Sequence, residues 1–145
     1  MKKTILTLIL TFITLPTFAG GVGYINYDKV LSEYRFAKTS MHEIETKANE
    51  IQKYLDQKED EFNKLDSPIQ KQKLEATVRN EMKTKEAAFN DFREKKEETV
   101  YSRIHAVSEK IRLEKGLDAV LDARSVFSGG VDLTDELIKK LNSVN

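Results

Sequence analysis

The sequence predicts a mainly α-helical protein with a small β body, in which one long antiparallel helical hairpin stands on a short-stranded base. The six glycines lie at positions 20, 21, 23, 116, 129 and 130, and Pro68 is the only proline beyond the first twenty residues. The stretch 24–115 therefore contains a single backbone breaker and must be helical almost throughout. Apolar residues recur within it at alternating steps of three and four, which is coiled-coil spacing. The flanking segments are richer in β-branched and aromatic residues, which is typical of strands.

The first nineteen residues have the organisation of a Sec-type signal peptide. A charged start at Lys2 and Lys3 precedes an apolar stretch over residues 5–18, and Thr17-Phe18-Ala19 forms a small-x-small cleavage site. A membrane anchor is the alternative, but the apolar stretch falls short of the roughly 20 residues that a spanning helix needs. Cleavage near Ala19 would release a soluble exported chain, without a cysteine for lipid attachment or for a disulfide.

Two apolar seams run along the predicted helical stretch. The first seam is Met41, Ile44, Ala48, Ile51, Leu55, Lys58, Phe62 and Leu65. The second runs through Val78, Met82, Lys85, Phe89, Phe92 and Lys96, and shifts by one position before Val100, Ile104, Val107 and Ile111. Such a shift locally unwinds a supercoil. The seams predict two helices packed along each other, although lysines interrupt both of them.

The turn of the hairpin is predicted at Asp66-Ser67-Pro68. Proline disfavours helix at the residue before it and suits the first position of a new helix. With Asp28 as the N-cap of the first helix, the two helices would be about 55 Å and about 70 Å long, at 1.5 Å per residue. Helices of this length far exceed those of ordinary globular domains.

Strands are predicted on both sides of the hairpin. Residues 22–27 and 117–122 form two of them, Gly116 ends the preceding helix, and Ser125-Val126-Phe127 is a third candidate. A last helix follows at residues 136–141, opened by the polar segment 132–135. Two or three short strands do not make a stable sheet alone, so the chain is expected to oligomerise through this end.

The composition argues against nucleic-acid binding and against catalysis. Removing two signal-peptide lysines from 24 basic and 24 acidic residues leaves 22 against 24, or about −2, with the signs interspersed. His42 and His105 are too far apart to share a metal, and serines lack the context of a nucleophile. The chain also lacks a glycine-rich phosphate loop. We therefore expect a binding protein with no enzyme activity, no metal and no cofactor.

Three segments resemble the Skp/OmpH family of periplasmic chaperones. They are VGYINYDKVL at 22–31, KGLDAVLD at 115–122 and VDLTDELIKKLN at 131–142. The charged middle of the chain fits the family only in character. The resemblance implies a homotrimer whose strands form a shared body, with three hairpins around a cavity that holds unfolded outer-membrane proteins.

The resemblance also implies a division of the chain. Residues 20–35 and 104–145 would form the β-containing trimerisation body, and residues 36–103 the helical hairpin, or tentacle. The residues expected in the body are Val22, Tyr24, Ile25, Val30, Leu31, Ile104, Val107, Ile111, Leu117, Val120, Leu121, Val126 and Phe127. Known members of the family are strongly basic, whereas this chain is nearly neutral, so the binding of lipid or lipopolysaccharide is not transferred to it.

The function that the resemblance implies is that of an ATP-independent holdase for unfolded outer-membrane β-barrel proteins. The candidate client-facing residues are Tyr54, Phe62, Leu74, Met82, Ala87, Ala88, Phe89 and Phe92. Tyr54, Leu74, Ala87 and Ala88 lie off the predicted seam, whereas packing within the hairpin competes with client binding for the phenylalanines. The alternative is a structural coiled-coil stalk or adaptor of the cell envelope, and the interrupted seam favours the chaperone.

Overall fold

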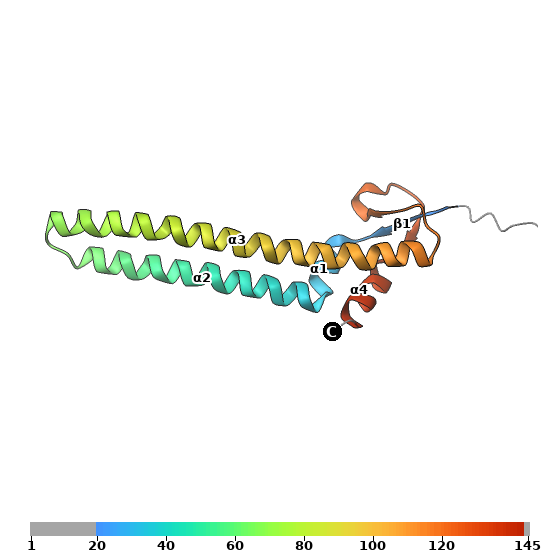
Figure 1. The fold of residues 1–145 in the computed structure, drawn as a ribbon, viewed down its shortest axis with the longest axis horizontal. Coiled ribbons are helices and arrows are strands. Elements are labelled where there is room, and N and C mark those ends of the chain that lie inside the picture. The colour runs from blue at the N-terminus through green and yellow to red at the C-terminus, as the bar shows by residue number, and fades with distance from the viewer. Residues whose placement is uncertain (1–19, 144–145) are drawn as a thin grey trace, which may run out of the picture.

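The computed structural model describes residues 20–143, which form a mainly helical fold with a small sheet, as the sequence predicts (Figure 1). Two long helices extend from one end of the molecule, where the strands and two short helices gather. We call this end, with the adjoining parts of the long helices, the sheet end. The predicted signal peptide at residues 1–19 lies outside the described residues.

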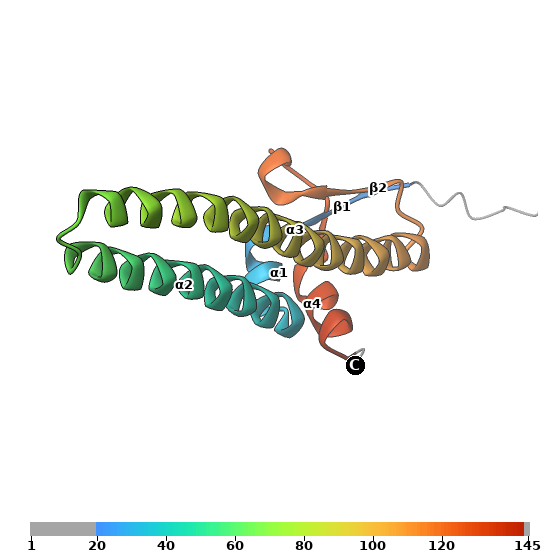
Figure 2. The ribbon, with the colours of Figure 1, turned by 60° about the vertical axis from the view of Figure 1, so that its left-hand side comes forward.

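The hairpin consists of α2 (Arg35–Asn63) and α3 (Pro68–Glu114), which run side by side in Figures 1 and 2. The chain turns between them at the predicted position. Ser67 is the N-cap of α3, and Pro68 occupies the first turn, where a backbone N–H has no helical partner to lose. At 1.5 Å per residue α3 is about 70 Å long and α2 about 44 Å.

A separate short helix, α1 (Tyr27–Glu33), precedes the hairpin. Asn26 caps it, because the Asn26 Oδ1 accepts the backbone N–H of Lys29 at 3.0 Å. Asp28 lies within the first turn, where a carboxylate is favourable beside the helix dipole. The expectation of one continuous helix capped by Asp28 is therefore wrong, and α2 is shorter than predicted.

The break between α1 and α2 falls at Tyr34, whose ψ of 113° is extended. Asn142 in the C-terminal helix stabilises this break from both sides. Its Oδ1 accepts the backbone N–H of Arg35 at 2.9 Å, and its Nδ2 donates to the carbonyl of Glu33 at 3.0 Å. The break thus depends on a residue more than a hundred positions away in the sequence.

The sheet has three parallel strands, with β1 (Val22–Ile25) between β2 (Ala119–Asp122) and β3 (Val131–Asp132). Gly23 of β1 lies opposite Val120 of β2. The first two strands agree with the sequence prediction, and their pairing brings the two ends of the described chain together. Both outer strands have one unpaired edge in this protomer.

The predicted strand Ser125-Val126-Phe127 is wrong. The chain instead forms a short 3-10 turn, η1 (Ala123–Ser125), because the Asp122 carboxylate accepts the backbone N–H of Arg124 at 2.9 Å. A loop follows, and Gly129 and Gly130, with φ of 82° and 89°, bend the chain toward β3. The third strand therefore lies after these glycines.

The end of α3 and the last helix follow the sequence signals. Gly116 has a φ of 63°, and its N–H donates to the carbonyl of Leu113 at 3.2 Å. The N–H of Leu117 donates to the carbonyl of Arg112 at 3.0 Å, which completes the usual glycine-terminated helix end. The last helix, α4 (Thr134–Ser143), includes the predicted 136–141 and extends it at both ends.

The apolar core lies at the sheet end, which includes the root of the hairpin, residues 35–40 of α2 and 100–114 of α3. The buried apolar residues are Ile25, Val30, Tyr34, Ala37, Val100, Ile104, Ile111, Leu117, Leu133, Leu137, Ile138 and Leu141. Gly23 permits the close approach of β1 to this core, because a Cβ atom there would lie 2.5 Å from Cδ1 of Leu133. Strands, α4 and the root of the hairpin therefore form one packed unit.

Candidate binding surface of the hairpin

The hairpin beyond its root has no buried core in this protomer. Between Met41 and Thr99, every residue of the described chain is exposed or half-buried. The predicted seam residues in this stretch, among them Ile51, Leu55 and Val78, are only half-buried. Pairing of the two helices therefore leaves much of the apolar and aromatic surface within reach of solvent.

The candidate client-facing residues divide into two groups in the structure. The half-buried group is Tyr54, Phe62, Leu74, Met82, Phe89 and Phe92, and the exposed group is Ala87 and Ala88. Tyr54 and Leu74 lie off the predicted seam, but the structure places both between the two helices. Tyr54 bonds to α3, and Leu74 lines a groove between the helices, one turn before Val78 in the same seam.

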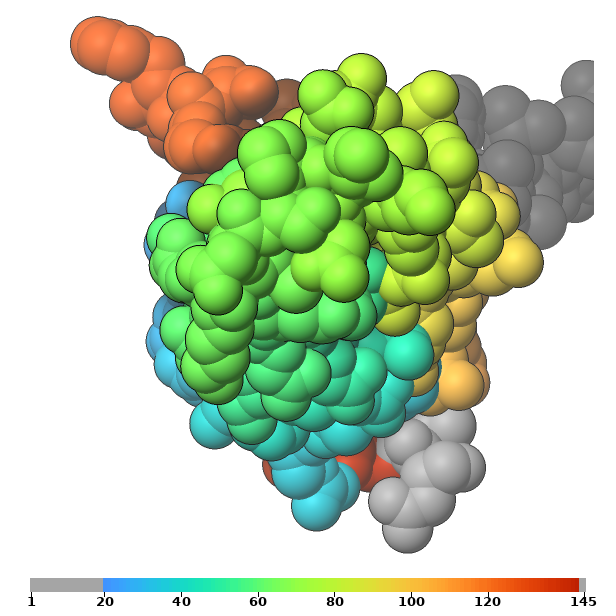
Figure 3. Space-filling view, turned by 90° about the vertical axis from the view of Figure 1, so that its left-hand side faces the viewer, coloured from blue at the N-terminus to red at the C-terminus, as the bar shows by residue number. Residues whose placement is uncertain are grey.

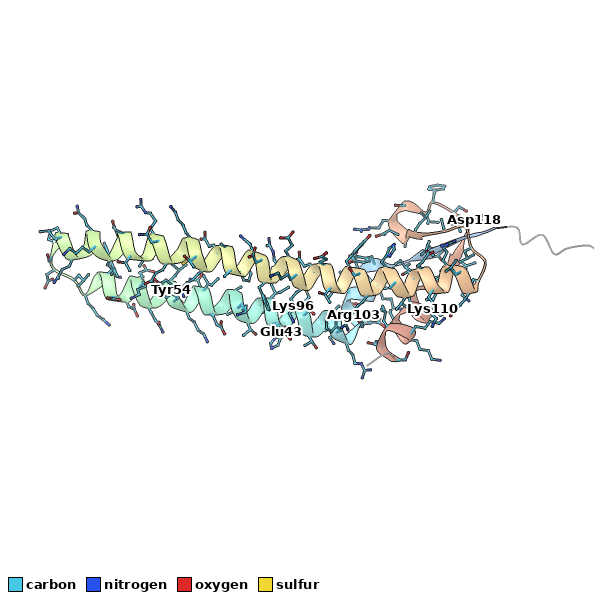
Figure 4. All side chains as sticks on the ribbon, viewed as in Figure 1. Glu43, Tyr54, Lys96, Arg103, Lys110 and Asp118 are labelled. Atoms are coloured by element: carbon cyan, nitrogen blue, oxygen red, sulfur yellow. The ribbon has the colours of Figure 1, made fainter. Side chains whose placement is uncertain are left out.

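Tyr54 forms a polar contact across the hairpin. Its hydroxyl donates to the carboxylate of Glu81, and this bond raises the pKa of Tyr54 to about 12. The Lys85 ammonium lies 4.5 Å from the centre of the Tyr54 ring, and that of Lys58 lies 5.9 Å from it. Figure 4 places Tyr54 between the two helices. The ring is thus flanked by cations rather than enclosed by apolar side chains.

Phe92 and Phe62 have the same kind of surroundings. Nζ of Lys47 lies 5.1 Å and that of Lys96 5.5 Å from the Phe92 ring centre, and Nζ of Lys71 lies 4.9 Å from that of Phe62. Lys96 also pairs with Glu43 across the hairpin (Figure 4). A cation over an exposed aromatic face contributes about 0.5–1 kcal/mol, so each of these contacts is weak by itself.

The lysines that interrupt the predicted seams therefore have a structural role that the sequence reasoning missed. Lys58, Lys85 and Lys96 each lie over an aromatic ring while their side chains stay half-buried. A signal for two of these contacts was present in the sequence. Lys58 follows Tyr54 by four positions, and Lys96 follows Phe92 by four, which places each pair on one helical face.

Two shallow grooves lie between the helices. One, of about 430 Å³ near the hairpin tip, is lined by Leu55, Phe62, Leu74 and Val78 together with charged side chains. The other, of about 200 Å³, contains Ile51, Ala88 and Phe89. Apolar residues beside charged ones suit an extended apolar segment, because long lysine and glutamate side chains can move aside without breaking a packed core.

The residues expected in the trimerisation body fall into three groups. Ile25, Val30, Ile104, Ile111 and Leu117 are buried within the single chain. Tyr24, Leu31, Val107, Val120 and Val126 are half-buried, and Val22, Leu121 and Phe127 are exposed. The first group forms the protomer's own core, so the latter two groups are the ones available for contact between subunits.

Within residues 20–143 no group of three or more histidine, aspartate or glutamate side chains could hold a metal ion. No helix in the same range is long and apolar enough to cross a membrane. The candidate binding surface is the lysine-flanked aromatic stripe of the hairpin, formed by Tyr54, Phe62 and Phe92.

Comparisons with known proteins agree on the fold. The family model for outer membrane protein (OmpH-like) matches residues 21–141. The fold is similar to a crystal structure of a candidate outer membrane chaperone (OmpH-like) from Caulobacter crescentus CB15, with a TM-score of 0.52 and 12% identity over 86% of this chain and 85% of the other. No curated protein sequence matches the chain. Since the family model spans nearly all of the described residues, the chain belongs to the OmpH-like family of outer membrane proteins.

Proposed function

We propose that this chain is an ATP-independent holdase chaperone of the periplasm, which binds unfolded outer-membrane β-barrel proteins and prevents their aggregation. One observation carries the proposal: between Met41 and Thr99 the hairpin has aromatic and aliphatic side chains but no buried one. Helices that served only to pack together would bury that surface. Membership of the OmpH-like family and the fold shared with a candidate outer membrane chaperone support the same function.

The working form in this proposal is a homotrimer. Its body comprises residues 20–35 and 104–145, and its three tentacles, residues 36–103, surround the client. Exposed Val22, Leu121 and Phe127, with the unpaired edges of β2 and β3, support self-association through the sheet end. Cleavage near Ala19 would deliver the chain to the periplasm. The near-neutral charge gives no support for direct binding to lipid or lipopolysaccharide.

Client binding in this mechanism uses many weak, exchangeable contacts. The lysines beside Tyr54, Phe62 and Phe92 keep the stripe hydrated while no client is present. An apolar client segment displaces the flexible lysine side chains and contacts the rings and the groove floors. Loss of any one contact costs little, so the client remains mobile while its strand edges are kept from pairing.

The decisive experiment measures light scattering by a denatured outer-membrane β-barrel after dilution, with and without the mature chain. Two deletions replace residues 59–75 or 51–85 by a short Gly/Ser turn. We expect the intact chain to suppress aggregation, the shorter deletion to weaken suppression and the longer deletion to abolish it. Circular dichroism and oligomer mass serve as controls, because both deletions leave the sheet end unchanged.

A tip variant tests the alternative of a stalk or adaptor, which is favoured only by Ile69, an isoleucine 66% exposed at the start of α3. For the chaperone, Ile69→Asp should leave suppression nearly unchanged. If the chain were a stalk, even the intact chain would not reduce aggregation of the β-barrel. Full suppression by the trimer that lacks residues 51–85 would refute the hairpin as the binding surface and move that role to the body.

A further inference from the structure

The sheet end contains a pocket of about 490 Å³ between α3 and the segment formed by β2 and η1. Its apolar lining is Ile25, Ile104, Val120 and Leu121 with the rings of Tyr27 and Tyr101. The size is within the range of pockets that bind small molecules. Nothing in residues 20–143 fills the pocket within this protomer.

The charged residues at the rim of this pocket are paired with each other. Arg112 donates to both carboxylate oxygens of Glu109 at 2.7 Å, and Arg124 donates to Asp122 at 2.7 and 3.0 Å. The Arg112 and Arg124 guanidinium groups lower the pKa of Glu109 and Asp122, which keeps both pairs ionised. The lining also includes His105 and Ser108, so the pocket presents a mainly apolar surface whose arginine and carboxylate groups are paired, which suits an uncharged and largely apolar occupant.

The loop after η1 carries a group of that kind. Phe127 is 105% exposed, and the segment 125–130, Ser-Val-Phe-Ser-Gly-Gly, contains no charged residue. Gly129, with φ 82°, has no atom within 4 Å of the position of a Cβ. In Figure 3 the orange segment that includes these residues projects from the surface of the molecule. A bare phenylalanine on a projecting loop is typical of an interface residue.

We propose that Phe127 of one protomer inserts into the pocket of a neighbouring copy of this chain. The loop carries no charge, and the charged groups of the pocket are paired, so the two surfaces are compatible. Each chain has one loop and one pocket, so every loop in a closed ring of chains can occupy the pocket of the next chain. Loop and pocket are different surfaces, which makes the contact heterologous, and heterologous contacts close into rings such as trimers rather than two-fold dimers. The inference rests on the self-association proposed above and names the residues that perform it.

Engineered cysteines test this contact directly, because the chain has no cysteine of its own. Phe127→Cys chains are refolded together with Leu121→Cys or Tyr101→Cys chains and then oxidised. Both partner positions line the pocket and are partly exposed, at 40% and 58%. We expect a mixed disulfide with at least one of them, since the bond forms only where the Cα atoms are within about 7 Å.

A matched control places the partner cysteine elsewhere on α3. Leu113 is 63% exposed and lies outside the pocket, so Leu113→Cys should form no mixed disulfide with Phe127→Cys. Failure of both pocket positions overturns the proposal. A disulfide that joins mainly two Phe127→Cys chains also overturns it, because it would indicate a two-fold contact between loops.

Assembly without cross-linking provides the second measurement. Phe127→Ala should raise the protein concentration needed for half-assembly by about tenfold or more, whereas Phe127→Leu, which keeps an apolar side chain, should raise it much less. If Phe127→Ala leaves assembly intact but weakens client protection, the loop binds clients and the proposal is wrong. Intact docking in a chain that fails to suppress aggregation would instead refute the proposed function alone.

Discussion

The packing of α4 on the sheet end can be tested with one leucine. Leu137 is fully buried, and α4 contacts α1, α3 and β1. Leu137→Ala would leave a cavity at the centre of this contact and loosen the helix that carries Asn142. Because Asn142 bonds both sides of the break at Tyr34, the change should reach the root of the hairpin as well.

The expected magnitude follows from burial. A leucine removed from a fully buried site costs about 2–5 kcal/mol, from lost transfer free energy and the remaining cavity. Leu113 on α3 is 63% exposed, so Leu113→Ala should change the free energy of unfolding by about 0.5 kcal/mol or less. Both positions are helical, so the difference in helix propensity between leucine and alanine cancels between the two variants.

Urea unfolding followed by far-ultraviolet circular dichroism measures the difference. Both variants are compared with the unchanged mature chain at one protein concentration, because self-association adds to the apparent stability. The midpoint of Leu137→Ala should fall well below that of Leu113→Ala with a similar slope. Equal midpoints for the two variants would refute the view that α4 is part of the packed unit.

Three further predictions concern single contacts. Gly23→Ala should destabilise the chain by about 1–3 kcal/mol, because the new methyl group meets the buried Leu133. Gly21→Ala should not, because its methyl group would make only an ordinary contact at 3.5 Å. Equal thermal unfolding of the two variants would contradict the close packing of β1. Ultraviolet titration should show a pKa of about 12 for Tyr54, and Glu81→Gln should return this pKa toward its usual range. An unchanged titration curve would mean that the bond between Tyr54 and Glu81 is absent in solution. Stability should be constant at neutral pH and fall with acidification below about pH 4, because hydrogen bonds lower the pKa values of Asp132 and Glu136 in the folded chain and protonation removes that contribution. Asp132→Asn should reduce this acid dependence, as measured by melting temperature between pH 7 and pH 3.

Local signals in the sequence were sufficient for the turn of the hairpin and the end of α3. Pro68 and Gly116 act through their own backbone preferences, so the turn and the end of α3 could be predicted from neighbouring residues alone. The strands at 22–25 and 119–122 were also predictable, since β-branched and aromatic residues cluster there.

Long-range contacts explain what the sequence did not predict. The break at Tyr34 requires Asn142, and the start of α1 adds a bond from the Asn26 N–H to Oγ1 of Thr134 at 2.9 Å. Neither partner can be recognised from local spacing. The false strand at 125–127 arose because Val126 and Phe127 have high strand propensity, which the turn at Asp122 overrides.

The candidate surface was predictable in its residue types but not in its arrangement. Periodicity identified Phe62, Phe89 and Phe92, yet treated the seam lysines as interruptions. A lysine combines an apolar stem with a hydrated ammonium group, so it can occupy a seam position beside a ring without being buried. Hydrophobic periodicity treats such a residue only as charged. It therefore cannot distinguish a lysine that interrupts the apolar seam from one whose stem lies over an aromatic ring.

The distribution of burial indicates how the proposed holdase could leave its hairpin without a core. In the described chain, all buried side chains lie at the sheet end or the hairpin root, so the stability of the fold does not depend on the distal helices closing tightly. If the distal helices buried their apolar seam fully, the contacts between the two helices would have to break before the aromatic rings could bind a client. Displacing a lysine from one of these rings costs about 0.5–1 kcal/mol, which a client segment can replace with its own contacts. Capture and release can then occur without unfolding the protein that performs them.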